Sequence, residues 1–206
     1  MRTATIILAW WLVTTSAASA AQSSAPAMPS CAGWPSWNSP PGRQWRQANR
    51  WRYHSDEEAQ IAFQRLTSDS PSPWPDWFVP TQQELPVGTR FKMVLGAYQP
   101  PTRPGGFGTF DDILHVEDLR LGLAVKEKWK PLVDRVVTYE VTRPLPVHVG
   151  PIGPQLDAQA CRLLPGRLSQ LEMLVPPDQR MAHLRIVSIT LFQPVEKAAS
   201  TAPPLR

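Results

Sequence analysis

The chain has 206 residues, a net charge of +4 from 21 Lys and Arg against 17 Asp and Glu, and 24 Pro but only 2 Cys. A hydrophobic fraction of 42% excludes full disorder, and two Cys exclude a disulfide-dense mini-scaffold and a four-Cys zinc site. The small charge comes without a basic run, an RNP-type motif or a recognition-helix pattern, so we expect no nucleic-acid partner.

Residues 1–20 have the pattern of an export signal. Arg2 supplies a positive end, residues 6–13 form a short apolar run, and residues 18–20 (ASA) form a small-residue cleavage site. The apolar run is shorter than the about 20 residues that span a bilayer, and a retained N-terminal anchor is the alternative. We therefore expect a secreted or periplasmic protein with no membrane attachment after cleavage, and a flexible leader at residues 21–30.

Export would place Cys31 and Cys161 in an oxidising compartment, where an even count of cysteines favours a disulfide bond. Closing a loop of about 130 residues contributes roughly 4–5 kcal/mol in the chain-entropy model. The alternative is a reactive cysteine nucleophile, but no Cys-His signature surrounds either residue. The sequence predicts a structural disulfide.

The first part of the mature chain is rich in tryptophan. Residues 31–53 carry five aromatic side chains among Pro and Arg, with no helical or strand period: Trp34, Trp37, Trp45, Trp51 and Tyr53. Such a segment is typical of an ordered coat around a core, and an aromatic carbohydrate-binding face is the alternative. Residues 55–66 predict a helix, since Ser55 can cap it and Glu58 completes a capping box.

The rest of the chain alternates loops and strands. Loops are expected at 67–87, 100–108 and 150–166, and a helix at 112–128, where apolar residues recur at helical spacing although Gly122 weakens the pattern. Strands are expected at 89–97, 135–142, 145–149, 168–175 and 183–195. Residues 31–195 then form a single globular domain of the α+β class with a mainly antiparallel sheet, followed by a disordered tail at 196–206.

The familiar catalytic and metal templates are missing from the sequence: it has no His-x-x-x-His pair, no P-loop and no Gly-x-Ser-x-Gly elbow. Two places are more suggestive. Arg90 opens a strand directly after a turn, and its guanidinium suits a diphosphate or a carboxylate. Gln170 and Glu172 point to one face of a strand, which is either the solvent face of an edge strand or a site beside a positive transition state.

These features resemble the ADP-ribosyltransferase fold, and in particular the NAD glycohydrolase toxins of the tuberculosis-necrotizing-toxin type. The resemblance covers roughly residues 84–190. It rests on residues 88–91 (GTRF), 96–98 (GAY), 139–154 (YEVTRPLPVHVGPIGP), Gly166 and Gln170. The Asp-Arg pair of that family falls near Phe91 and Lys92, so Arg90 or Lys92 would take its place.

The resemblance implies a split, mainly antiparallel sheet with helices at the N-terminus and in the middle of the chain, and cleavage of the nicotinamide–ribose bond of NAD. It implies that Glu172 stabilises the oxocarbenium ion, Gln170 orients the ribose or the acceptor, Arg90 holds the diphosphate and Tyr98 offers a stacking surface. NAD would be the substrate, with no further cofactor and no metal, and a target or immunity protein would be the expected partner.

The alternative is a non-catalytic exported binding or accessory protein on the same scaffold, because a fold does not fix a function. The two readings differ in geometry. An enzyme needs Arg90, Gln170 and Glu172 to converge on one cleft, whereas a scaffold leaves them scattered. A sugar-binding module would instead need the N-terminal Trp residues lined up on an open face.

Overall fold

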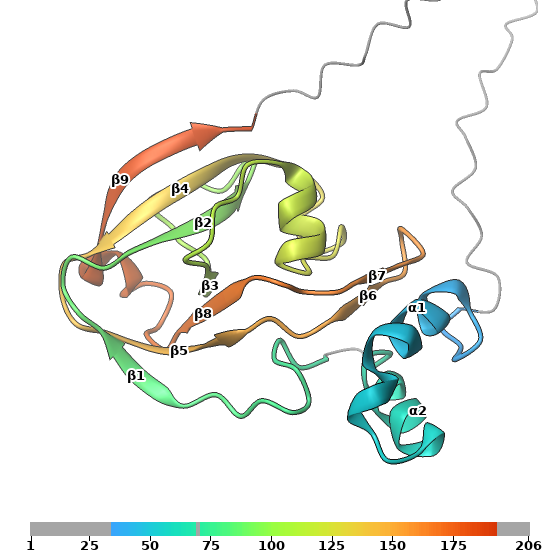
Figure 1. Ribbon diagram of the computed structural model, residues 1–206. Coiled ribbons are helices and arrows are strands. Elements are labelled where there is room, and N and C mark those ends of the chain that lie inside the picture. Colours follow the sequence, from blue (N-terminus) through green and yellow to red (C-terminus); the bar gives the residue numbers. More distant parts are fainter. Residues whose placement is uncertain (1–33, 69–70, 193–206) are drawn as a thin grey trace, which may run out of the picture.

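The computed structural model describes residues 34–68 and 71–192, and its architecture is α+β with antiparallel sheets, as predicted (Figure 1). A four-stranded sheet has the order β1-β5-β8-β3, and a three-stranded sheet has the order β2-β4-β9. The bounds of the first are β1 Gln82–Leu85, β5 Leu145–Pro151, β8 Ser169–Met173 and β3 Phe107–Gly108. Those of the second are β2 Arg90–Gly96, β4 Val133–Val141 and β9 Leu184–Leu191, with the short helix η3 Arg180–His183 before β9.

The main core lies between these two sheets. Alternate residues of each strand point inward, so every second side chain is buried and apolar. This core contains Leu85, Phe91, Met93, Leu95, Val137, Tyr139, Val141, Leu145, Val147, Leu171, Met173 and Leu184. Because the side-chain period is two, the intervening residues of β2 and β8 point away from the core, and both Lys92 and Gln170 belong to this outward set.

Strand β3 lies between β8 and β2 and joins the two sheets. It pairs with β8, and just beyond it the backbones of Lys92 and Thr109 exchange hydrogen bonds of 2.7 and 2.9 Å. Gly108 is required here, because a Cβ at that position would meet the Phe91 ring at 2.7 Å. The Asp111 carboxylate then accepts hydrogen bonds from the backbone and the hydroxyl of Ser169, both at 2.6 Å, which fixes the loop after β3 to the start of β8.

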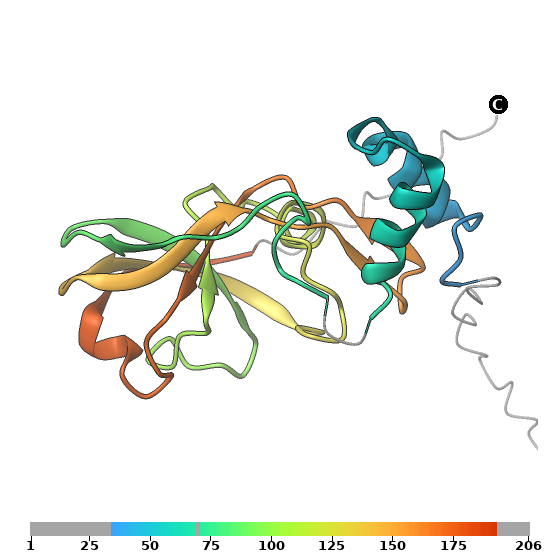
Figure 2. The same cartoon turned by 90° about the horizontal axis from the view of Figure 1, so that it is seen from below.

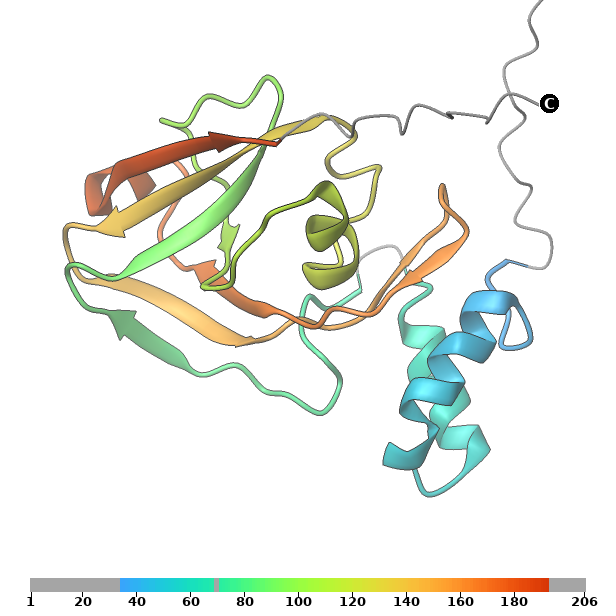
Figure 3. The ribbon, with the colours of Figure 1, turned by 45° about the horizontal axis from the view of Figure 1, so that its top comes forward.

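The N-terminal helices, α1 Pro40–Asn49, the 3₁₀ turn η1 Arg50–Arg52 and α2 Asp56–Arg65, form a unit at one end of the molecule (Figure 2). They pack beside the hairpin of β6 Gln155–Asp157 and β7 Arg162–Leu164 (Figure 3). Their shared core consists of Trp45, Ala59, Ala62, Phe63, Leu156 and Leu163. Ser55 caps α2 as predicted, since its Oγ accepts a hydrogen bond from the Glu58 N–H at 3.1 Å, and the Glu58 carboxylate accepts in return from the His54 N–H at 2.9 Å, one residue before the N-cap.

The predicted helix at 112–128 is wrong over most of its length. Only residues 116–122 are helical there, and most of that stretch is the π-helical turn η2 Asp118–Gly122. Gly122 is a poor helix former and Ala124 has a left-handed φ of 49°, so the helix ends at this point. Only a glycine fits at 122, because a side chain there would meet Leu168 Cδ1 at 2.6 Å. The apolar residues of this segment are buried as expected, since Ile113 and Leu119 pack against the outer face of β2 and β4. The backbone that carries them is not a regular α-helix.

Several elements were missed by the sequence analysis. Helix α1 lies in the segment interpreted as a coat without a period, β1 lies in the expected loop at 67–87, and the β6–β7 hairpin lies in the expected loop at 150–166. Helix α1 has a recognisable start, since Ser39 caps it and Pro40 and Pro41 occupy its first turn. The β strands here are three or four residues long and offer too few residues for a period to appear.

Candidate functional site

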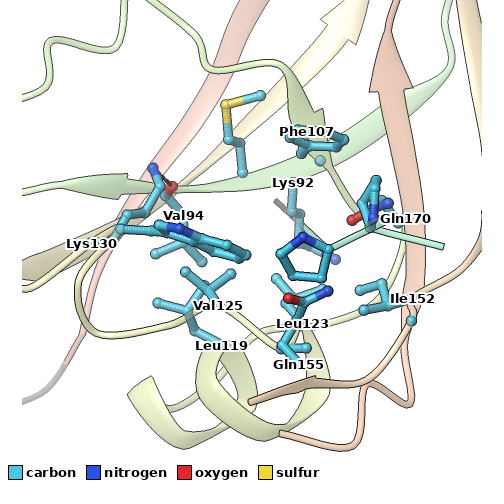
Figure 4. A pocket seen from close by; sticks show the side chains of 17 residues that line it. Lys92, Val94, Phe107, Leu119, Leu123, Val125, Lys130, Ile152, Gln155 and Gln170 are labelled. Carbon is cyan, nitrogen blue, oxygen red and sulfur yellow. Dashed lines mark hydrogen bonds between the residues drawn. The ribbon is translucent and has the colours of Figure 1, made fainter. Parts of the chain in front are cut away.

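A cavity of about 640 Å³ lies on the outer side of the β2–β3–β8 seam (Figure 4). That volume is within the range of small-molecule sites, about 300–1,000 Å³. Its lining is mostly apolar and includes Val94, Phe107, Leu119, Leu123, Trp129 and Ile152. Four polar side chains also line it: Lys92, Lys130, Gln155 and Gln170. An apolar cavity with a few polar groups is the usual form of a ligand site.

One wall of the cavity is the irregular segment that follows η2, and Arg120 holds that segment in place. The Arg120 guanidinium donates to the carbonyls of Val125 and Lys126, both at 3.1 Å, and of Lys130 at 2.6 Å. Burial lowers the pKa of this guanidinium, but three carbonyl acceptors compensate for its desolvation. The segment is thus folded around a buried cation, which brings Val125, Trp129 and Lys130 to the cavity.

Lys130 and Lys92 differ in how strongly their ammonium groups are held by other residues of the chain. Lys130 Nζ donates to the Val94 carbonyl at 2.9 Å and to Gln99 Oε1 at 3.2 Å, and burial lowers the pKa of its amine. Lys92 is paired with Asp112, whose side chain is mostly exposed. An ion pair with an exposed carboxylate is weak, so the Lys92 ammonium is available to an anionic ligand at the rim.

Gln170 and Gln155 are the most unusual lining residues. Their side chains are nearly fully buried, with 8% and 2% exposed, and Gln170 Nε2 and Gln155 Oε1 have no hydrogen-bond partner among the described residues. Figure 4 shows both side chains on the side of the cavity near Ile152, across from Lys130. A buried amide group without a partner costs free energy, so these two positions retain an unused hydrogen-bonding capacity.

Glu172 shares the outward face of β8 with Gln170 but is not among the residues that line the cavity. It lies opposite His148 of β5, and His148 Nδ1 is 3.2 Å from Glu172 Oε2. Phe107 of β3 is its neighbour on the other side. The predicted catalytic carboxylate is therefore part of a half-buried His–Glu pair beside the cavity.

Arg90 forms an ion pair on the outer face of the three-stranded sheet. Its Nε donates to Glu140 Oε2 at 2.8 Å, and Arg185 of β9 donates to the other carboxylate oxygen. The two guanidinium groups hold the pKa of Glu140 below its usual value. Two residues further along β2, Lys92 rather than Arg90 reaches the cavity.

Tyr98 is 90% exposed at the end of β2. It lines a separate hollow of about 280 Å³, which shares Trp129 and Lys130 with the main cavity. Of the four residues proposed from the sequence, only Gln170 lines the main cavity, and Arg90, Glu172 and Tyr98 do not converge with it. Sequence reasoning missed Gln155, Trp129 and Lys130, since each lies in a segment without a readable period.

The tryptophan-rich segment packs mainly inward. Trp37 and Trp45 pack around Phe63 with tilted or edge-on rings and centroids 5.7–6.1 Å apart, so they form the core of the helical unit rather than a coat without regular structure. Trp51 is instead exposed, and Arg52 lies within 5.1 Å of the Trp51 ring and 5.3 Å of the Trp77 ring. The four tryptophans therefore do not form one open sugar-binding face.

Other expectations fall partly beyond the structure. Cys31 lies outside the described residues, as do the export signal, the leader and the tail at 196–206, so the Cys31–Cys161 disulfide stays a prediction. Cys161 itself occupies the β6–β7 turn with a left-handed φ of 50°. Within residues 34–68 and 71–192, no helix is long and apolar enough to cross a membrane, and no three His, Cys, Asp or Glu side chains are grouped as metal ligands.

No protein-family model and no curated protein matches this chain. Among solved structures, the chain is similar to the structure of Tne2 in complex with Tni2. The two share 22% sequence identity at a TM-score of 0.47, and the match covers 58% of this chain and 97% of that chain. This is a distant structural relation.

Proposed function

We propose that this chain is an exported NAD-consuming effector or toxin that cleaves the nicotinamide–ribose bond of NAD in the cavity at the β2–β3–β8 seam. The observation that carries the proposal is that Lys92 and Gln170 line one cavity. The sequence resemblance gave the diphosphate to Arg90, with Lys92 as the other substitute for the family's Asp-Arg position, and gave Gln170 the ribose or the acceptor. The cavity brings Lys92 and Gln170 together although 78 positions of sequence separate them.

In this proposal the bond between C1′ of the ribose and the pyridinium nitrogen breaks, and its electron pair leaves with neutral nicotinamide. The ribose becomes an oxocarbenium ion, water attacks C1′, and ADP-ribose and a proton are released. The carbonyl oxygen of Gln170, the negative end of the amide dipole, stabilises that positive charge, and its Nε2, which has no partner among the described residues, orients the ribose by donating to a hydroxyl. Lys92 binds the diphosphate at the rim, in place of its pairing with Asp112.

NAD is the substrate in this proposal and no further cofactor is invoked. Export to the periplasm or the medium, and a target or immunity protein as partner, belong to the same proposal and rest on the sequence. Glu172, which lies beside the cavity and next to His148, is assigned a smaller part than Gln170.

The second candidate is a non-catalytic exported binding or accessory protein. One observation favours it: none of the described Asp or Glu residues lines the cavity, and Arg90 is held by Glu140. A protein of this kind would bind NAD, or a similar ligand, and release it unchanged.

The test is to measure nicotinamide release from NAD by the purified exported chain and by four variants. We expect Gln170→Ala to lower kcat about 100-fold or more, which is the usual cost of losing a group that stabilises developing charge. Lys92→Ala should mainly raise KM, Glu172→Ala should have a smaller effect than Gln170→Ala, and Gln64→Ala, on the exposed face of α2, should behave as the parent.

Two outcomes would overturn the enzymatic proposal. NAD binding without release favours the non-catalytic candidate. Neither binding nor release removes NAD from consideration for this chain. A release that is insensitive to Gln170→Ala would place the reaction outside this cavity.

A further inference from the structure

Gln155 belongs to the β6–β7 hairpin, which no part of the proposed reaction uses, yet its side chain lines the cavity. Only 2% of the residue is exposed, and its Oε1 has no hydrogen-bond partner among the described residues. A buried amide oxygen without a hydrogen-bond donor costs free energy, and a ligand that supplies the donor would remove that cost.

The orientation of this amide is determined by the chain. Gln155 Nε2 donates to the Ser72 carbonyl at 2.9 Å. An amide turned the other way would bring its oxygen against that carbonyl oxygen, which is repulsive, so the nitrogen faces Ser72 and the oxygen is left for another donor. Gln155 is therefore a preset hydrogen-bond acceptor.

The neighbours of Gln155 match one end of the proposed substrate. Gln155 and Gln170 lie on the same side of the cavity, near Ile152 (Figure 4). A ribose beside Gln170 would place the attached pyridine ring within reach of Leu123 and Ile152, the apolar side chains that line the same cavity. The polar group on that ring is a primary carboxamide, whose N–H groups are donors.

We infer that Gln155 is a specificity-determining residue of this cavity, and that its Oε1 accepts a hydrogen bond from the carboxamide N–H of nicotinamide. The inference rests on the proposed function for the identity of the substrate. It adds that the site selects the amide form of the pyridine ring, because an analogue without the N–H leaves the buried oxygen unpaired.

The test compares NAD with its 3-acetylpyridine analogue, whose acetyl group is uncharged and similar in shape to the carboxamide but has a methyl group in place of the amide nitrogen. Nicotinic acid adenine dinucleotide is the second probe, and it adds a negative charge. Dissociation constants and kcat/KM are measured for the parent chain, for Gln155→Met, and for Gln82→Met as a control at an exposed glutamine of β1.

We expect the parent chain and Gln82→Met to favour NAD over the acetylpyridine analogue by about tenfold or more in binding, since a buried acceptor then loses its partner. In Gln155→Met the preference should fall to about threefold or less. The intrinsic reactivity of each dinucleotide is the same in every variant, so only a change in the ratio between variants reports on Gln155.

The outcomes separate this inference from the proposed function. Cleavage of NAD with no preference over the acetylpyridine analogue overturns the role of Gln155 and leaves the proposed function standing. Binding with the expected preference but no nicotinamide release overturns the proposed function and supports the role of Gln155. An unchanged preference in Gln155→Met overturns the inference. If that variant fails to fold, Gln155→Asn, which keeps the amide but shortens the side chain and withdraws the oxygen, is measured in its place with the same expected fall in preference.

Discussion

Gln170 tests whether the unpaired amide in the cavity wall lowers the free energy of unfolding of the ligand-free protein and is kept because it binds a ligand. Its Nε2 is buried and has no partner among the described residues, and the side chain is 8% exposed. Replacing it with methionine keeps the length of the side chain and removes the amide. The variant Gln170→Met should therefore relieve a penalty without opening a void in the wall.

The magnitude follows from the cost of leaving a buried polar group without a hydrogen bond, about 1–3 kcal/mol. For a domain of this size, each kcal/mol corresponds to about 2–4 °C in Tm, so the ligand-free variant should melt about 2–12 °C above the parent. The gain should be accompanied by loss of function. NAD at about 100 times its Kd should stabilise the parent by about 2.7 kcal/mol and the variant by much less.

The assay is thermal and urea unfolding of the parent, of Gln170→Met and of Gln64→Met, each with and without NAD. Gln64 lies on the exposed face of α2, and its replacement should change the free energy of unfolding by less than about 0.5 kcal/mol. A Gln170→Met variant that is less stable than the parent would refute the reasoning, because it would show that the amide has a stabilising partner in the folded protein.

Three further predictions concern the fold around the site. Phe63→Ala should lower the free energy of unfolding by about 3–5 kcal/mol in a single urea transition, since its ring is 1% exposed; a separate early transition would show that the helices unfold alone. Gly122→Ala should cost about 1–3 kcal/mol, because its Cβ would meet a leucine methyl at 2.6 Å, whereas Gly96→Ala meets only a carbonyl at 3.5 Å and should be nearly neutral in the same assay. Burial alone would raise the pKa of Asp111, but hydrogen bonds, chiefly from Ser169, outweigh burial and lower the pKa, so the carboxylate's contribution to stability is complete above about pH 4 and is lost as pH falls through the lowered value. Urea unfolding measured from pH 6 to 2 should therefore show that the free energy of unfolding falls less steeply with acid for Asp111→Asn than for the parent. An equal fall in the two proteins would contradict this prediction.

The sequence by itself determined the local features that depend on short-range chemistry. The capping box at Ser55 and Glu58, the strands at β2, β4, β5, β8 and β9, and the antiparallel α+β class were all readable, because period-two patterns and side-chain caps act over a few residues. The shared face of Gln170 and Glu172 followed from the same alternation. The sequence also pointed to Lys92 as one substitute for the Asp-Arg position of the resembling family.

Tertiary structure alone decided which of these residues meet. Arg90 and Lys92 stand on one face of β2, but β4 brings Glu140 to Arg90, β9 adds Arg185 on the same carboxylate, and Lys92 is left at the cavity. The helix expected at 112–128 has the right apolar spacing, yet the backbone leaves the helical region just after Gly122, with a left-handed φ of 49° at Ala124. Local propensity favours a helix there by a few tenths of a kcal/mol per residue, and the hydrogen bonds from the buried Arg120 to the Val125, Lys126 and Lys130 carbonyls hold the segment in another conformation.

Gln155 shows the same limit most clearly. Nothing in the residues around it marks the side chain, because its role depends on a carbonyl 83 positions earlier and on a cavity wall built from β2, β8 and the segment after η2. Hydrogen bonds and steric contacts between distant segments are set by the packing of the whole chain, and no period or motif in a single sequence encodes them.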